Sequence, residues 1–145
     1  MKCLLQRVSS AAVHVADECV GAVEKGLLVF VGIEPHDSTV TINRMADRVL
    51  AYRVFPDEQG RMNVNVAAAN GGVLLISQFT LAADTRSGNR PGFQTAAPPE
   101  HARVLFSEFV TQVSARHPNV ATGRFGADMQ VSLVNDGPVT FLLEA

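Results

Sequence analysis

The sequence has only two cysteines, Cys3 and Cys19, among its 145 residues. They form no CxxC pair and no cluster with histidine, which argues against a disulfide framework and against a zinc site of the usual spacing. Free cysteines are commonly buried and behave as small apolar side chains. We therefore expect both thiols to be reduced and buried.

Long apolar runs are also missing. The longest, residues 26–33, is far too short to cross a bilayer, and the first residues lack the apolar stretch of a signal peptide. We expect a cytoplasmic protein without a membrane partner. The net charge of −2 argues against a broadly basic nucleic-acid surface, but it permits a partner that touches the protein with only one end of an RNA.

Familiar catalytic signatures are absent as well. The sequence contains no GxSxG elbow, Walker loop, HExxH or GxGxxG motif. Its four histidines are scattered and have no ligand spacing to one another. We therefore expect no metal and no cofactor.

What the sequence does contain is typical of one globular domain spanning residues 1–145, with 47% apolar and 18% charged residues. Apolar and β-branched segments predict strands at 4–8, 12–16, 20–24, 26–33, 73–79, 129–134 and 139–143. Two stripes with helical spacing predict amphipathic helices, one with Ile42, Met45, Ala46, Val49 and Leu50, the other beginning near Pro99 and ending at His117. This order predicts an α+β fold, a mostly antiparallel or mixed sheet with two helices packed on it.

Polar side chains stand where one apolar strand ends, at Ser77, Gln78 and Thr80, around Phe79. An irregular segment, 82–99, follows. Ser and Thr often end a strand through local hydrogen bonds to the backbone, and the residue types alone favour that interpretation. The other interpretation is a functional site, because strand ends hold exposed backbone groups rigidly.

A second segment, residues 135–138, separates the last two predicted strands and contains Gly137 and Pro138. Turn chemistry makes it an ordinary hairpin connection. Alternatively, a cis proline bond would present two parallel carbonyls that accept from an α-ammonium group in one orientation. The loop at 86–93 offers Arg86 and Arg90, either to solvent or to RNA phosphates and ribose.

Residues 77–81 read SQFTL and residues 135–140 read NDGPVT. These segments resemble the SQFTL and NxGPVT signatures of the D-aminoacyl-tRNA deacylase family. Residues 6–8, 90–93, 123–125 and 127–131 also look like family positions, so the resemblance runs along the whole chain.

The resemblance implies a homodimer with the family's α+β fold that hydrolyses, without metal, the ester of tRNA charged with a D-amino acid or glycine. It implies that Gly137 and Pro138 form a Gly-cisPro element that reaches the partner subunit's site and rejects L-amino acids. Arg7 and Met129 are then further substrate-binding and selectivity positions, Arg7 by orienting the Gly137-Pro138 segment.

Within this reading, Ser77 and Gln78 bind the adenosine or ribose, and the backbone N–H groups of Phe79 and Thr80 stabilise the oxyanion. No base near Thr80 is evident, so we expect its hydroxyl to position water or substrate rather than attack.

Two alternatives remain: a non-catalytic dimeric module that binds an RNA end or small ligand, and a hydrolase of small esters or peptides with Ser77 or Thr80 as covalent nucleophile. Release of D-amino acid from charged tRNA, and trapping of an acyl-enzyme, distinguish them.

Overall fold

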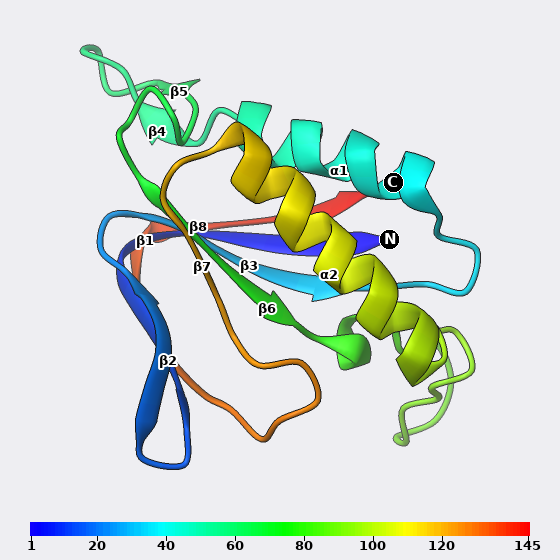
Figure 1. Ribbon diagram of the computed structural model, residues 1–145. Coiled ribbons are helices and arrows are strands. Elements are labelled where there is room, and N and C mark those ends of the chain that lie inside the picture. The colour runs from blue at the N-terminus through cyan, green and yellow to red at the C-terminus, as the bar shows by residue number, and fades with distance from the viewer.

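The computed structural model describes residues 1–145, which form one six-stranded sheet, a small two-stranded sheet and two long helices (Figure 1). In chain order the elements are β1 (Lys2–Val15), β2 (Glu18–Val23), β3 (Gly26–Gly32), α1 (Thr39–Ala51), β4 (Phe55–Pro56), β5 (Met62–Val64), β6 (Gly72–Ser77), the 3₁₀ turn η1 (Phe79–Ala82), α2 (Pro99–Arg116), β7 (Val120–Thr122) and β8 (Gln130–Glu144). The predicted α+β class is confirmed.

The long strand β1 organises the sheet. Along one edge its residues 2–8 pair with β3 and its residues 11–15 pair with β2, while β8 pairs with the other edge. All three pairings are antiparallel. β6 and then β7 extend the sheet beyond β3 in parallel, which makes it mixed, as predicted.

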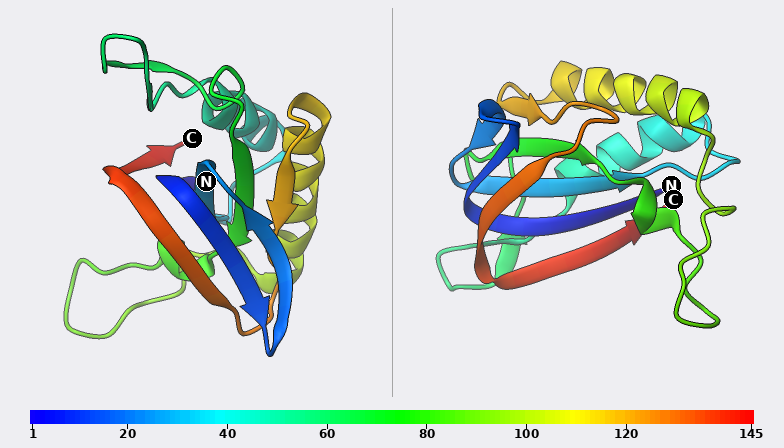
Figure 2. Two further views of the ribbon diagram at one scale, coloured as in Figure 1. Left: turned by 90° about the vertical axis from the view of Figure 1, so that its left-hand side faces the viewer. Right: turned by 90° about the horizontal axis from the view of Figure 1, so that it is seen from below.

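Both helices cover one face of this sheet (Figures 1 and 2). The predicted stripe of α1 is buried at Ile42, Met45, Ala46 and Val49, and α2 contributes Phe109, which is fully buried. Together with the sheet residues they form a core of 24 buried residues. Burial of the two stripes fixes how the helices lie on the sheet.

The other face of the sheet encloses a second, smaller core of seven buried residues from β1, β2, β3 and β6, including Val8, Leu28 and Ile76. Met129, Val131 and Leu133 pack against it from the start of β8 and the residue before it. The sheet therefore curls toward a barrel, as the two views in Figure 2 show. This curl brings residues 125–131 close to the end of β6.

Several local predictions are wrong. Segments 4–8 and 12–16 are one continuous strand, β1, and segments 129–134 and 139–143 are one strand, β8. The short strand β7 was not predicted. Cys3 is buried as expected, but Cys19 is exposed on the β1–β2 hairpin, because β2 lies at the edge of the sheet.

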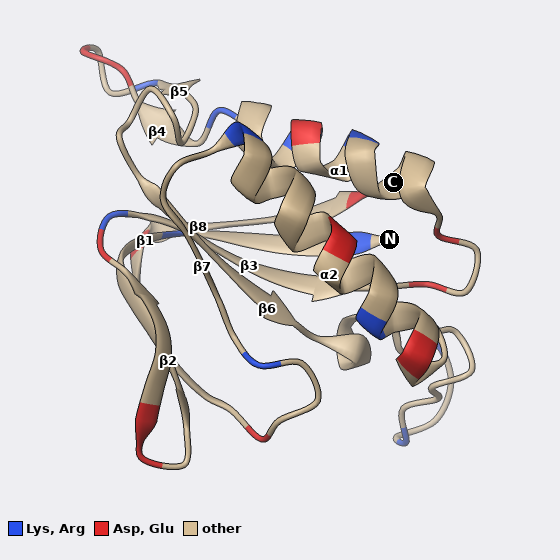
Figure 3. Cartoon of the chain, viewed as in Figure 1, with Lys and Arg blue, Asp and Glu red and all other residues tan.

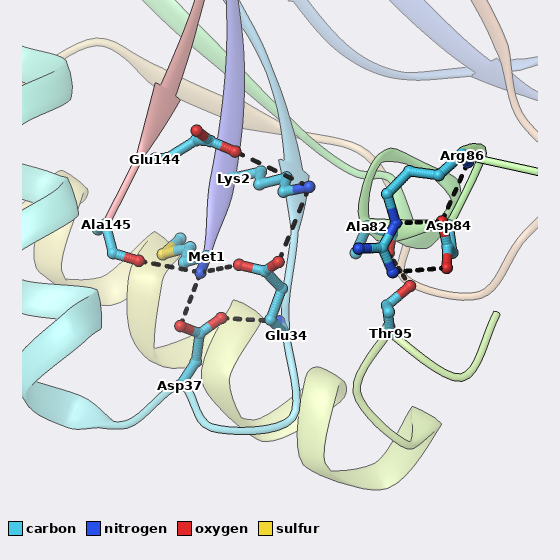
Figure 4. Close-up of polar contacts among 10 residues, drawn as sticks. All are labelled: Met1, Lys2, Glu34, Asp37, Ala82, Asp84, Arg86, Thr95, Glu144 and Ala145. Atoms are coloured by element: carbon cyan, nitrogen blue, oxygen red, sulfur yellow. Dashed lines mark hydrogen bonds and ion pairs between the residues drawn. The ribbon is translucent and has the colours of Figure 1, made fainter. Parts of the chain in front are cut away.

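The ends of the chain lie side by side (Figure 1). The α-ammonium of Met1 donates to Glu34 at 2.6 Å, to Asp37 at 2.8 Å and to the Ala145 carbonyl at 3.3 Å (Figure 4). In return, Ala145 N–H donates to the Met1 carbonyl. These contacts tie β1 and β8 to the segment before α1. Neither helix has the length and apolar character needed to span a bilayer.

Candidate active site

The end of β6 presents backbone N–H groups. Gln78 N–H donates to the Val31 carbonyl at 2.7 Å, which ends the pairing with β3. The hydrogen bonds of η1 then begin with Leu81 N–H to the Gln78 carbonyl, at 3.2 Å. The N–H groups of Phe79 and Thr80 lie at the start of this turn. The first N–H groups of a helical turn have no carbonyl partner within the turn. They can donate to a ligand.

A cavity of about 640 Å³ opens beside this strand end. Ser77, Gln78 and Phe79 line it, together with Met129. The remaining wall comes from the ends of β3 and β6, the loop at 93–98, the first turns of α2, and residues 125–131. Most of the wall is apolar, and none of its side chains is acidic, basic or histidine. The cavity is therefore suited to a flat, largely apolar group with polar contacts at one edge.

Much of this cavity wall could not be predicted from the sequence. Ala96, Ala97, Pro98, Ala102 and Phe106 from the loop and helix line the cavity, and the Phe106 ring packs against Phe125 with the ring centroids 6.0 Å apart. Small apolar residues carry no catalytic signature, and Ala102 and Phe106 read as core positions of a helical stripe. The one available signal was the unusual Ala-Ala-Pro-Pro run, residues 96–99, which leads into the first residue of α2.

Thr80 lies just outside the cavity wall and is exposed. Its hydroxyl oxygen accepts a hydrogen bond from Gln78 Nε2 at 2.5 Å, which links two of the predicted site residues. No carboxylate or histidine hydrogen-bonds to Thr80 or lines the cavity. The side chains around Thr80 therefore offer no base that would activate it as a nucleophile.

Gly137 and Pro138 do not form a hairpin connection. They lie in an irregular stretch of β8 between Asn135, which pairs with Val8, and Thr140, which pairs with Gln6. The extra residues bulge from the strand, Gly137 and Pro138 are exposed, and the peptide bond between them is cis. The hairpin prediction is wrong because one long strand passes through the bulge without reversing direction.

Side chains hold this bulge on both sides. Asn135 accepts from Val139 N–H at 2.7 Å and donates to the Val139 carbonyl at 3.2 Å, closing the bulge onto itself. On the β1 side, Arg7 donates from Nε to the Asp136 carbonyl at 2.8 Å. These bonds replace the ladder hydrogen bonds that the bulge removes.

Within one chain the bulge and the end of β6 are far apart. Ser77 pairs with Val31, which pairs with Cys3, whereas the bulge faces Arg7. The offset is about 13 Å along the strands and about 14 Å across them, from standard strand spacings. The structure thus brings Ser77, Gln78, Phe79, Thr80 and Met129 together, and it places Arg7 with Gly137 and Pro138 elsewhere.

The residues that line the cavity carry no charge. Figure 3 shows basic and acidic residues alternating along α2, which supplies part of the cavity wall. No group of three or more His, Cys, Asp or Glu side chains is placed to hold a metal ion.

A family model described as D-Tyr-tRNA(Tyr) deacylase matches residues 4–144. The chain belongs to this family. Relatives named D-aminoacyl-tRNA deacylase include one from Stenotrophomonas maltophilia, 62% identical over 144 residues, and one from Saccharophagus degradans, 61% identical over 143 residues. In both comparisons the match covers 99% of each chain.

Two solved structures share the fold. One, titled c-Myc DNA Unwinding Element Binding Protein, is 37% identical with a TM-score of 0.95 and covers 100% of this chain and 99% of its own. Another, a probable eukaryotic D-amino acid tRNA deacylase, has a TM-score of 0.86 at 14% identity and covers 98% of this chain and 97% of its own. The predictions of family, fold and enzyme class made from the sequence are confirmed.

Proposed function

We propose that this chain, as a homodimer, hydrolyses the ester bond of tRNA charged with a D-amino acid or glycine, and leaves L-aminoacyl-tRNA intact. Deacylation of D-aminoacyl-tRNA is the activity for which its family is named. The observation that carries the proposal is the cavity that ends at Ser77 and Phe79, next to the N–H groups at the start of η1.

In this proposal the terminal adenosine of tRNA occupies the cavity. Phe106 and Phe125, which pack against each other with ring centroids 6.0 Å apart, and Met129 offer apolar surface against which a base can stack. Ser77 and Gln78 supply hydroxyl and amide groups at the edge, where the ribose would lie. This arrangement places the aminoacyl ester over η1, outside the deepest part of the cavity.

The ester chemistry then depends on the backbone. Hydrolysis passes through a tetrahedral intermediate whose oxyanion needs preorganised donors. The N–H groups of Phe79 and Thr80, at the start of η1, are the donors in this proposal. Water attacks the carbonyl carbon. The neighbouring ribose 2′-hydroxyl takes up the proton of the water and passes its own proton to the ester oxygen, which leaves as an alcohol when the tetrahedral intermediate collapses. The released carboxylic acid then loses its proton to solvent. The absence of acids and bases from the cavity wall supports assistance by the substrate's own hydroxyl.

Chirality is selected by Gly137 and Pro138 of the partner subunit. In one chain this bulge is too far from Ser77 to touch the same substrate, and it is exposed, so a second copy can receive it. Its carbonyls would accept from the α-ammonium and leave no room for an L side chain. Exclusion of this kind tolerates many D side chains and also glycine.

Mixed dimers test whether the bulge acts across the interface. One chain carries Ser77→Trp, which blocks its own cavity; the other carries Gly137→Ala, whose added Cβ would lie 2.5 Å from Val139 N and force the bulge to move. The single open cavity then faces the intact bulge of the other chain. We expect it to cleave D- but not L-tyrosyl-tRNA. Loss of discrimination would mean that the bulge acts within its own chain.

The rival readings make different predictions. A non-catalytic binder of RNA ends would retain tRNA without releasing D-amino acid. A covalent hydrolase would accumulate an acyl-enzyme on Ser77 or Thr80, detectable as a mass increase after rapid quenching. We expect turnover without such an intermediate.

A further inference from the structure

Two aromatic side chains lie exposed at the mouth of the cavity. Phe79 is 57% exposed and Phe93 is 46% exposed, and their ring centroids are 5.2 Å apart with a tilt of 55°. Both also line the cavity. Aromatic rings that remain open to solvent beside a binding cavity are suited to stacking on a second flat group.

The loop that carries Phe93 is fixed at its base. Asp84 and Gly92 exchange two backbone hydrogen bonds, of 2.8 and 2.9 Å, and Thr95 Oγ1 donates to the Ala82 carbonyl at 2.6 Å. Figure 4 shows the Thr95 bond beside the pair formed by Asp84 and Arg86. Phe93 follows Gly92 directly, so these bonds hold its backbone beside η1.

The two arginines of this loop differ. Arg86 donates from Nε and Nη2 to the two carboxylate oxygens of Asp84, both at 2.9 Å, and this guanidinium holds the pKa of Asp84 well below its usual range. The pair therefore stays charged at neutral pH. Arg90 is exposed and forms no side-chain hydrogen bond or ion pair, so its charge is available to an external anion.

We propose that Phe79 and Phe93 stack on the base that precedes the terminal adenosine of tRNA, and that Arg90 contacts the phosphate of that nucleotide. This inference rests on the proposed function, because the terminal adenosine must occupy the cavity. Single-stranded RNA is commonly held by aromatic stacking combined with arginine. A contact limited to one base and one phosphate needs no broad basic surface, which agrees with the net charge of −2.

A protein partner is the competing occupant of this aromatic pair. RNA is favoured because the pair continues the cavity wall and shares its loop with an unpaired cation. Composition does not separate the two occupants, because protein interfaces are also enriched in phenylalanine and arginine; the continuity of the pair with the cavity wall does.

The test compares two substrates, D-tyrosyl-tRNA and D-tyrosyl-adenosine, which lacks the preceding nucleotide. Phe93→Leu keeps an apolar cavity wall but removes the ring. We expect KM for the tRNA to rise roughly 5- to 100-fold with kcat unchanged, from the usual effect of losing one base stack, and a much smaller change for the adenosine ester.

Arg90→Gln tests the phosphate contact. The slope of log(kcat/KM) for the tRNA against log[salt] should become shallower by about 0.7, the value for one phosphate of a single strand. Arg44→Gln is the matched control, since Arg44 is exposed on α1, away from the cavity. It should leave the slope unchanged.

Equal losses on both substrates would overturn the inference, as would an unchanged KM for the tRNA. Dissociation of the dimer by Phe93→Leu, measured by light scattering, would assign the pair to a protein interface instead.

The affinity of the wild type, Phe93→Leu and Arg90→Gln for an RNA hairpin without an amino acid, ending in single-stranded CCA, tests the same contacts without turnover. If the wild type hydrolysed neither ester, the proposed function would be refuted, and this binding experiment would still decide the inference.

Discussion

Arg7 and Asp136 are joined by a hydrogen bond of 2.8 Å from the guanidinium Nε to the backbone carbonyl directly before Gly137. The same guanidinium donates from Nη1 to the Val54 carbonyl at 2.6 Å. Arg7 thus ties the bulge of β8 to the segment that follows α1. The Arg7 side chain is only 12% exposed; its bond to Val54 is partly buried, whereas its bond to Asp136 is open to solvent.

Replacing Arg7 by Gln should weaken both folding and selectivity. Hydrogen bonds from a charged donor contribute about 1.5–3 kcal/mol each, and we expect the free energy of unfolding in urea to fall by about 2 kcal/mol. The freed bulge should also discriminate less between D- and L-tyrosyl-tRNA. Asp136→Ala is the control: it removes only the exposed carboxylate, 3.5 Å from Arg7 Nε, and keeps the carbonyl that Arg7 binds, so selectivity should persist. Equal loss of selectivity in both variants would contradict this role.

Thr80→Ala separates positioning from nucleophilic attack. Loss of a covalent nucleophile lowers kcat by about 10⁶-fold in serine hydrolases, whereas we expect a loss of less than about 100-fold here. The reason is that the backbone N–H groups of η1 remain when the hydroxyl is removed. Single-turnover release of D-tyrosine measures the difference, and complete inactivity of a folded variant would restore the nucleophile hypothesis.

Filling the cavity should impair substrate binding. Ala102 is buried on α2 and lines the cavity, so Ala102→Leu would project into space that the adenosine needs. We expect KM for D-tyrosyl-tRNA to rise about tenfold, equivalent to about 1.4 kcal/mol. Ala115→Leu makes the same change on an exposed position of the same helix and should have no effect. Unchanged KM in Ala102→Leu would place the adenosine elsewhere.

The two thiols should react differently. Burial raises the pKa of the Cys3 thiol far above its ordinary value, whereas Cys19 is exposed. Thiolate is the reactive form, so a maleimide at pH 8 should label one site per native chain, Cys19, and two after unfolding. Peptide mass spectrometry identifies the site. Rapid labelling of Cys3 in the native protein would contradict the packing of β1.

The helices could be predicted from the sequence because their buried apolar residues recur at the spacing of one helical face. Ile42, Met45, Ala46 and Val49 repeat at helical spacing, and each is buried where α1 meets the sheet. The interior strand β3 was equally clear, since it is apolar on both faces. In contrast, β7 has only three residues, too few for a recognisable alternation.

The continuity of β8 could not be predicted, because Asn135, Asp136, Gly137 and Pro138 are all typical turn residues. Contacts with residues far away in the sequence make these residues a bulge. Arg7 on β1 donates to the Asp136 carbonyl, and the parts of β8 before and after the bulge both pair with β1. The motif around Ser77 was found through family resemblance. The cavity beside it depends on distant small residues such as Ala97 and Ala102, which only the fold brings together.

If the protein hydrolyses aminoacyl-tRNA and selects its substrates by excluding L side chains, deacylation of D-tyrosyl-, L-tyrosyl- and glycyl-tRNA by the purified wild type under matched conditions will show it. We expect rapid cleavage of the D-tyrosyl and glycyl esters and no cleavage of L-tyrosyl-tRNA above the uncatalysed rate. Equal rates on the D- and L-tyrosyl esters would contradict it.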